Sequence, residues 1–347
     1  MRLEDAAGPR RALVSPAVGR RLPLTLFVSA LALVPLLLPL ASPAADVPAS
    51  EVRLVMGTTA EVRATGLADP SAAFDRAFAA LDRVDDQMSL WKESDLTRLN
   101  RDGEGTVPAE LFAVVRHALD VAAASGGAFD PTVEPLVRAT GGVGGPHRTL
   151  ADAERRELVA RVGARNVHLD ETTRTILLDG RAALDLGGIA KGYAADQALL
   201  ALRAAGARSG LVDLGGSSIG VFGEPLTADV RYPEGADAPW ASFMVLDLSV
   251  STSGADQKPN HIVDPRTGLP ATGVLAATVV ATTGIEADAL STAVYVLGAD
   301  EGLRLLAQRK ADGFVLHRDG GRRVLRTTPG FATRFRLMAA AGIEVTE

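Results

Sequence analysis

Strand-like and helix-like patterns follow one another through this sequence without a fixed rhythm, and that irregularity limits the folds open to it. After Asp69-Pro70, apolar residues recur every three or four positions from Phe74 to Met88, which predicts an amphipathic helix. Further helix patterns cover residues 108–124, 149–163, 189–205, 286–297 and 299–308; strand patterns lie near residues 167–170, 175–179, 211–214, 243–248, 276–281, 313–317 and 323–326. Because the strict strand–helix–strand alternation of a doubly wound sheet is absent, we predict an α+β fold.

The N-terminus has the pattern of a secretory signal. Arginines at positions 10, 11, 20 and 21 precede an apolar run from Leu22 to Ala41, and the small residues of Ser42-Pro43-Ala44 follow. We therefore predict a signal peptide over residues 1–44 and export to the periplasm or the extracytoplasmic face of the membrane. A retained membrane anchor is the alternative, since about 20 apolar residues can span a bilayer. The export route, Sec or twin-arginine, stays open.

Composition excludes several classes of function. The 347 residues include no cysteine, which excludes disulfides, cysteine-ligated metals, iron–sulfur clusters and a cysteine nucleophile. The formal net charge of −6 argues against a nucleic-acid surface, which needs a basic footprint. Lysine is rare in this sequence, so a lysine within an unusual motif is a candidate functional residue.

Such a lysine lies in the segment from Leu184 to Asp196. A predicted strand ends at Asp185, Gly187-Gly188 frees the backbone, and a predicted helix carries Lys191 in its first turn. Backbone N–H groups at a helix start and a nearby lysine suit a phosphate group. A tight turn with a solvated lysine is the alternative reading.

Two serine-containing segments are less specific. Gly216 to Gly220 fits the G-x-S-x-G pattern around Ser218, and Asp264 and His317 follow in the order of a hydrolase triad. A glycine-rich turn after a buried strand is favoured there, because the βα repeats of that hydrolase fold are absent. The second segment, Ser251 to Gly254, precedes His261, which could be a base, a ligand or a packed ring.

Asp288 and Thr292 form a candidate metal pair. They lie four residues apart in a predicted helix and so share a face. A carboxylate and a hydroxyl are hard oxygen ligands that suit Mg²⁺. Alternatively, Asp288 only complements the helix dipole and Thr292 is a surface residue.

In their order and spacing, these segments resemble the ApbE family of FAD:protein FMN transferases, also called flavin transferases. The resemblance covers about residues 52–300 and predicts one transferase domain over residues 52–340, an ApbE-like fold of mixed sheets with packed helices. The blocks that carry it are Met56-Gly57-Thr58, Met88 to Lys92, Ser94-Asp95-Leu96, Asn100, Gly127 to Thr132, Leu184 to Asp196, Leu214-Gly215-Gly216, Ser253-Gly254, His261 to Gly268, and Ala287 to Leu290 with Thr292.

The resemblance implies a set of site residues. Those matching FAD-contacting positions are Met56, Ser89, Leu90, Trp91, Ala128, Phe129, Asp130, Asp185, Lys191 and His261. Mg²⁺ is expected at the carbonyl of Gly188 and the side chains of Asp288 and Thr292. His261 and Lys191 are the candidate catalytic residues, as a base and as a positive charge beside the pyrophosphate.

The implied reaction joins FMN to a partner protein. A threonine (or serine) hydroxyl of the acceptor attacks the FMN-side phosphorus of FAD, and AMP leaves. An FAD pyrophosphatase and a binding-only flavin carrier are the alternatives. The sequence departs from the family pattern at Ser217, where an acid is usual, at Ala255-Asp256, where a tyrosine is usual, and in the short loop of residues 256–260.

Overall fold

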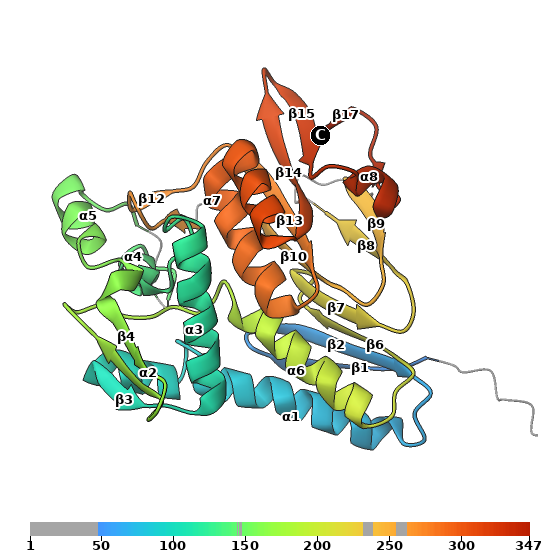
Figure 1. Ribbon diagram of the computed structural model, residues 1–347, viewed down its shortest axis with the longest axis horizontal. Helices are drawn as coiled ribbons and strands as arrows, with labels where there is room; N and C mark the ends of the chain where they lie inside the picture. The colour runs from blue at the N-terminus through green and yellow to red at the C-terminus, as the bar shows by residue number, and fades with distance from the viewer. Residues whose placement is uncertain (1–47, 144, 146–147, 232–238, 255–261) are drawn as a thin grey trace, which may run out of the picture. The chain divides into compact units, whose positions relative to one another are not determined.

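The computed structural model describes residues 48–347, except residues 144, 146–147, 232–238 and 255–261 (Figure 1). The predicted signal segment and His261 lie outside the described residues. Within the described part of the chain, no helix has the length and apolar character needed to cross a membrane.

A nine-stranded sheet organises the molecule. Neighbouring strands are antiparallel, except for the parallel pair β15–β17. In spatial order the strands are β1 (Ala49–Val55), β2 (Thr58–Thr65), β6 (Ser209–Leu214), β7 (Ser218–Phe222), β10 (Ser249–Gly254), β13 (Val274–Ala281), β14 (Asp312–Asp319), β15 (Arg322–Thr327) and β17 (Ile343–Thr346).

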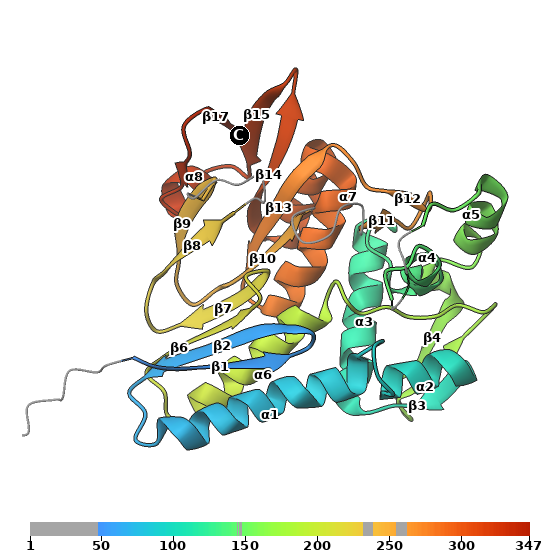
Figure 2. The same ribbon diagram turned by 180° about the vertical axis from the view of Figure 1, so that it is seen from behind.

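Helices cover one face of this sheet (Figures 1 and 2). The helices over this face are α1 (Pro70–Met88), α6 (Ala190–Ala204) and α7 (Gly284–Arg309), and α3 (Ala109–Ala124) packs against α1 and α7. α6 packs against β6 and β7, α7 packs against β10, β13 and β14, and α1 lies on α6. Along β13, Ala277 and Val279 join the core beneath the helices, whereas Ala276 and Val280 face the other side. This alternation is the period-2 pattern of a strand buried on both faces.

The other face is covered by a small sheet of β16 (Met338–Ala339), β9 (Ala241–Val245) and β8 (Leu226–Val230), with α8 (Phe331–Arg334). The rings of Phe243, Phe314 and Phe331 meet edge-to-face there, with centroids 5.4–5.7 Å apart. This second core is separate from the one beneath the helices.

The remaining elements form a lobe beside α3, seen at the left of Figure 1. They are α2 (Asp95–Asp102), β3 (Glu104–Thr106), α4 (Glu134–Ala139), α5 (Asp152–Val159), β4 (Val167–Asp170), β5 (Thr175–Leu178), β11 (Val263–Asp264), β12 (Leu269–Pro270), and the 3₁₀ turns η1 (Pro131–Val133) and η2 (Ala164–Asn166).

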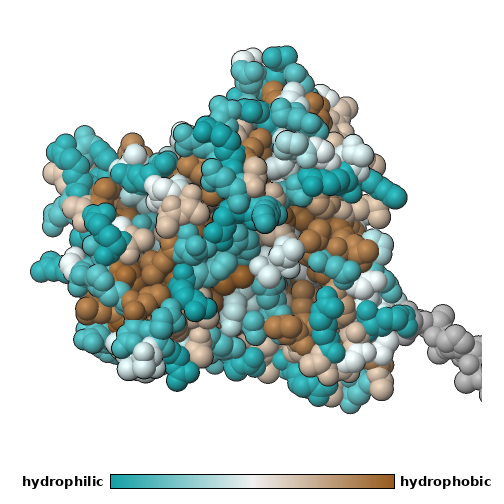
Figure 3. Space-filling model, in the orientation of Figure 1, coloured by the Kyte–Doolittle hydropathy of each residue, from teal (hydrophilic) through white to brown (hydrophobic). Residues whose placement is uncertain are grey.

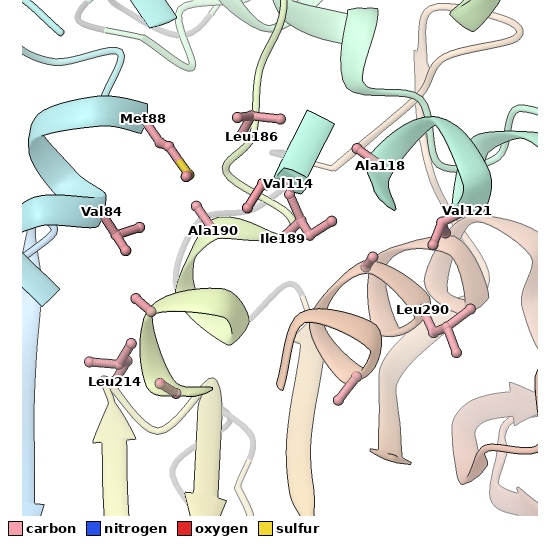
Figure 4. Close-up of a cluster of buried hydrophobic side chains, with 14 of the residues drawn as sticks. Val84, Met88, Val114, Ala118, Val121, Leu186, Ile189, Ala190, Leu214 and Leu290 are labelled. Carbon is pink, nitrogen blue, oxygen red and sulfur yellow. The ribbon is translucent and has the colours of Figure 1, made fainter. Parts of the chain in front are cut away.

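The core beneath the helices joins the lobe to the main sheet. Buried side chains from α1, α3, α6, α7, β6 and the segment entering α6 lie together there, as Figure 4 shows for Val84, Met88, Val114, Ala118, Val121, Leu186, Ile189, Ala190, Leu214 and Leu290. Leu186 and Ile189 are fully buried, so the segment carrying the predicted lysine motif is fixed by packing at both ends of its glycine pair.

The observed elements confirm the predicted α+β class and most of the predicted ranges, with three differences. The strand predicted near residues 243–248 is β9, which ends at Val245. The helix predicted over residues 149–163 is shorter, as α5, which has no buried residue. The two helices predicted over residues 286–297 and 299–308 abut as α7, with a kink where Gly298 has φ 79° and ψ −175°. Figure 3 shows hydrophobic side chains in separate patches among hydrophilic ones on the face drawn there.

Candidate functional site

Asp288 lies at the start of α7, buried at 5% exposure, where α7 meets α6 and the sheet. Its Oδ2 accepts a hydrogen bond from the Gly192 N–H at 2.9 Å. Its Oδ1 accepts hydrogen bonds from the Ser251 hydroxyl at 2.9 Å and the Ser218 hydroxyl at 3.3 Å. All three donors are neutral, so the carboxylate is held in place without a cationic partner among them.

Two glycines allow this contact. An added Cβ at Gly192 would lie 2.0 Å from the Gly284 carbonyl oxygen and 2.6 Å from Asp288 Cβ. A Cβ at Gly284 would lie 2.3 Å from the Gly192 carbonyl oxygen. Only glycine permits the backbones of α6 and α7 to approach this closely.

A second carboxylate links the same two helices, with α7 as the donor and α6 as the acceptor. Asp196 of α6 accepts hydrogen bonds from the N–H groups of Gly284 (2.6 Å) and Ile285 (3.0 Å), the first residues of α7. Burial raises the pKa of Asp196 to about 6, although these two hydrogen bonds oppose the shift. Each helix therefore donates to a carboxylate of the other.

The predicted metal ligands Gly188 and Thr292 come together. A Cβ at Gly188 would lie 3.0 Å from Thr292 Oγ1 and 3.3 Å from the ring of Phe129. The Ser253 hydroxyl is 3.3 Å from Thr292 Oγ1. The hydroxyl of Thr292 thus lies beside the backbone of the glycine loop, four residues along α7 from Asp288.

Lys191 and Asp185 flank the same glycine loop. Lys191 is half-buried in the first turn of α6, immediately before Gly192, and makes no hydrogen bond or ion pair with the described residues. Asp185 is anchored through its N–H to the Pro131 carbonyl (2.7 Å), and its Oδ1 accepts from the Gly187 N–H (2.7 Å). Burial raises the pKa of Asp185.

The other predicted flavin-contacting residues lie on three segments. Met56 forms the β1–β2 turn with Gly57, where φ values of 52° and 71° fit a two-residue hairpin turn. Ser89 ends α1, Leu90 is half-buried, and Trp91 is 66% exposed.

Ala128, Phe129 and Asp130 are buried between α3 and η1. Asp130 Oδ1 accepts from the N–H and hydroxyl of Thr132 (2.9 and 2.6 Å), and Oδ2 accepts from the Ala164 N–H (2.9 Å). These bonds give Asp130 a structural role in its turn, and flavin contact by Asp130 stays a prediction.

A cavity of about 580 Å³ opens in the lobe, and Leu90 is the one predicted site residue in its lining. The lining also includes Arg101, Arg138, Arg161 and Arg181. A cavity of about 530 Å³ lies between α3 and α7, lined by Ala113, Arg116, His117, Asp120 and Ile285. Neither cavity contains the residues around Asp288.

The hydrolase reading of Ser218 finds no support in the described contacts. Ser218 is fully buried and its hydroxyl faces Asp288 and Ser251. The guanidinium of Arg266 donates a hydrogen bond of 2.9 Å to each carboxylate oxygen of Asp264. Reasoning from sequence missed Ser218 and Ser251 as partners of Asp288; the signal was a strand rich in hydroxyl residues rather than apolar ones.

The comparisons with known proteins agree with this architecture. The family model described as "ApbE family" matches residues 56–315. A FAD:protein FMN transferase of Treponema pallidum is 32% identical over 329 residues, covering 84% of this chain and 90% of the relative. One from Rhodobacter capsulatus is 33% identical, covering 87% of this chain and 60% of the relative.

Solved structures give the same result. The flavinyl transferase ApbE of Pseudomonas stutzeri in its apo form superposes with a TM-score of 0.75 at 27% identity, covering 84% of this chain and 97% of that one. The ApbE protein of Thermotoga maritima gives a TM-score of 0.76 at 26% identity, covering 82% and 98%. Together with the fold, these relatives show that the chain is a transferase. More particularly, the chain belongs to the ApbE family, as the sequence motifs predicted.

Proposed function

We propose that this chain is a Mg²⁺-dependent FAD:protein FMN transferase that joins FMN to a threonine hydroxyl of an exported or membrane-bound acceptor and releases AMP. FAD as the substrate and a protein as the acceptor follow from the names of its relatives. The observation that supports this most is the buried Asp288 carboxylate, which accepts hydrogen bonds from three neutral donors among the described residues. Thr292, four residues further along α7, lies beside the Gly188 backbone.

The residues present fit a magnesium ion. The donor set of one carboxylate, one hydroxyl and one backbone carbonyl consists of hard oxygens. The space beside Thr292 exists because Gly188 has no Cβ. Among the described residues, no group of three or more histidine and acidic side chains gathers. Asp288 is the carboxylate in this donor set and would supply its negative charge. When bound, Mg²⁺ would neutralise charge on the pyrophosphate.

The chain's own residues supply the remaining needs of phosphoryl transfer. Lys191, on the helix that donates Gly192 N–H to Asp288, can place its ammonium beside the phosphate oxygens. The new bond joins the acceptor Oγ to the FMN-side phosphorus, and the bond from that phosphorus to the bridging oxygen breaks, so AMP leaves with the bridging oxygen. The acceptor proton needs a base, for which His261 is our candidate.

The test incubates the chain without residues 1–44 with FAD, Mg²⁺ and a purified domain carrying a candidate acceptor threonine, with its Thr→Val form as the control. We expect an FMN-sized mass gain on the threonine form and an equal amount of AMP. AMP and free FMN without acceptor modification would indicate a pyrophosphatase, and bound FAD without AMP would indicate a carrier.

Two variants test the named groups. Thr292→Ser keeps the hydroxyl and is expected to retain transfer, whereas Thr292→Val removes it and is expected to lose most of the rate. His261→Ala is expected to bind FAD and fail in transfer; undiminished transfer by this variant would remove His261 from the mechanism.

A further inference from the structure

A chain of hydroxyl groups runs beside α7 from Asp288 toward Thr292. Ser251 Oγ lies 3.4 Å from both Ser218 Oγ and Ser291 Oγ. Ser253 Oγ continues it, at 2.9 Å from Ser291 Oγ and 3.3 Å from Thr292 Oγ1. β10 supplies Ser251 and Ser253, two residues apart, so both side chains lie on the strand face toward α7.

The two oxygens of Asp288 are used unequally. A carboxylate oxygen offers about two acceptor positions. Oδ1 uses both, for the hydroxyls of Ser251 and Ser218, whereas Oδ2 uses one, for the Gly192 N–H. Oδ2 therefore keeps the one acceptor position that these contacts leave open.

We propose that Ser251, assisted by Ser218, is a positioning residue that fixes the Asp288 carboxylate so that Oδ2 alone is presented to a divalent cation. This inference rests on the proposed function, because it assigns these serines a role in the magnesium site. It goes beyond that function by separating the carboxylate that binds from the hydroxyls that orient it.

The chemistry of the serines suits this role. Ser251 is 2% exposed and its hydroxyl also lies 2.9 Å from the Ser217 carbonyl oxygen, so its position is fixed by the β7–β10 pairing. A hydroxyl orients a carboxylate without cancelling its charge, whereas an arginine or lysine there would compete with the cation. Asp288 Oδ1 and the Ser217 carbonyl oxygen, both at 2.9 Å, share the single hydroxyl proton of Ser251, and the Ser251–Asp288 contact is shorter than the 3.3 Å contact of Ser218.

The test measures cation binding directly. Mn²⁺, which accepts the same oxygen ligands as Mg²⁺, is titrated into the FAD-bound protein, and free Mn²⁺ is followed by electron paramagnetic resonance. Removing a group that orients a metal ligand weakens binding by about 10- to 100-fold. We expect Ser251→Ala to fall in that range, Ser218→Ala to show a smaller loss, and Ser251→Thr, which keeps the hydroxyl, to recover most of the affinity.

Thr252→Val is the matched control. Thr252 is the intervening residue of β10, and its hydroxyl pairs with the buried Thr278 at 2.9 Å, away from Asp288. This variant loses a hydroxyl contact on the same strand, so it reports any general loosening of β10. Unfolding midpoints of all variants are measured without metal, so that affinity changes are compared at known stability.

The outcomes separate the inference from the proposed function. Wild-type protein that binds no Mn²⁺ in the presence of FAD contradicts the metal site and this inference together. Wild-type binding with equal affinity in Ser251→Ala overturns the inference alone, as does an equal loss in Thr252→Val. Weakened binding in Ser251→Ala, retained binding in Thr252→Val and recovery in Ser251→Thr support it.

Discussion

Two carboxylates at the start of α7 are two residues apart and are held in opposite ways. Glu286 faces α3 and the end of α7, where Arg309 donates to both of its oxygens at 2.8 and 3.0 Å and His117 Nε2 lies 2.7 Å from Oε2. Asp288 faces α6 and the sheet and is held by a backbone N–H and two serine hydroxyls.

The difference separates a carboxylate paired with basic side chains from one held by neutral donors. Burial pushes the pKa of Glu286 upward, but His117 and Arg309 outweigh it and hold that pKa at about 2. Its charge is thus already balanced inside the fold. The charge of Asp288 is oriented but not balanced by its three donors, which is what a cation site requires.

The largest expected effect comes from removing the unbalanced charge. Asp288→Asn keeps the side-chain shape but loses the negative charge, so FMN transfer should fall by roughly 10²–10³-fold, in the range for loss of one electrostatic group at a reaction centre. Rates are measured from AMP release at saturating FAD. Glu286→Gln is the control and should retain transfer; an equal rate loss in both variants would remove the distinction between the two carboxylates.

Gly192→Ala tests the close approach of the α6 and α7 backbones, which lets the Gly192 N–H reach Asp288. Because the new Cβ would lie 2.0 Å from the Gly284 carbonyl oxygen, we expect a loss of about 3 kcal/mol in the free energy of unfolding. Gly105→Ala on β3 is the control, since its added Cβ has its nearest contact at 3.9 Å from Leu99 Cδ1. Urea denaturation of both variants gives the comparison, and equal stabilities would contradict the close approach of α6 and α7.

Asp196 should make the protein less stable as the pH rises. Its carboxyl ionises near 3.8 in the unfolded chain but near 6 in the fold, so the folded state holds an additional proton between these values. Stability from this group is therefore full below pH 3.8 and falls by about 2–3 kcal/mol by pH 6. Unfolding of wild type and Asp196→Asn is compared from pH 3.5 to 7, and the difference should change with this sign.

Glu286 should give the smaller effect with the opposite sign. The pKa of Glu286 is about 2 in the fold and 4.5 in the unfolded chain. The ionised carboxylate therefore stabilises the fold fully above pH 4.5, and this stabilisation is lost as the pH falls toward 2. Because the group is partly solvated, we expect it to contribute about 2 kcal/mol to the free energy of unfolding. Wild type and Glu286→Gln should differ in stability at pH 5.5 and converge near pH 2; a constant difference would show that charge is not the cause.

The sequence predicted the parts of the molecule whose patterns are local. Regular apolar spacing predicted α1, local helix patterns predicted α3 and α6, and the helix pattern around Asp288 and Thr292 is part of α7. β10 was missed because its residues, Ser249 to Gly254, are mostly hydroxyl-bearing and lack the apolar alternation of a buried strand. The Ser251 hydroxyl contacts the Asp288 carboxylate. The apolar pattern expected of a buried strand is therefore absent at the candidate site.

The contacts between distant segments could not be predicted in this way. Ser218, Ser251 and Gly192 reach Asp288 from 70, 37 and 96 residues away. None of these residues stands out in its own segment: Ser218 follows a glycine turn, Ser251 lies in a strand, and Gly192 lies in a helix. The resemblance to a family indicated Gly188, Asp288 and Thr292, but only the folded chain shows which neutral groups donate hydrogen bonds to Asp288.

The reciprocal hydrogen bonds between α6 and α7 also limit how these two helices can move relative to each other. Gly192 N–H donates to Asp288, while Gly284 and Ile285 donate to Asp196, so the two helices are joined in both directions. Sliding one helix along the other by a turn of about 5.4 Å would break all three bonds together. These three hydrogen bonds therefore hold the start of α7 and the first two turns of α6 in one register.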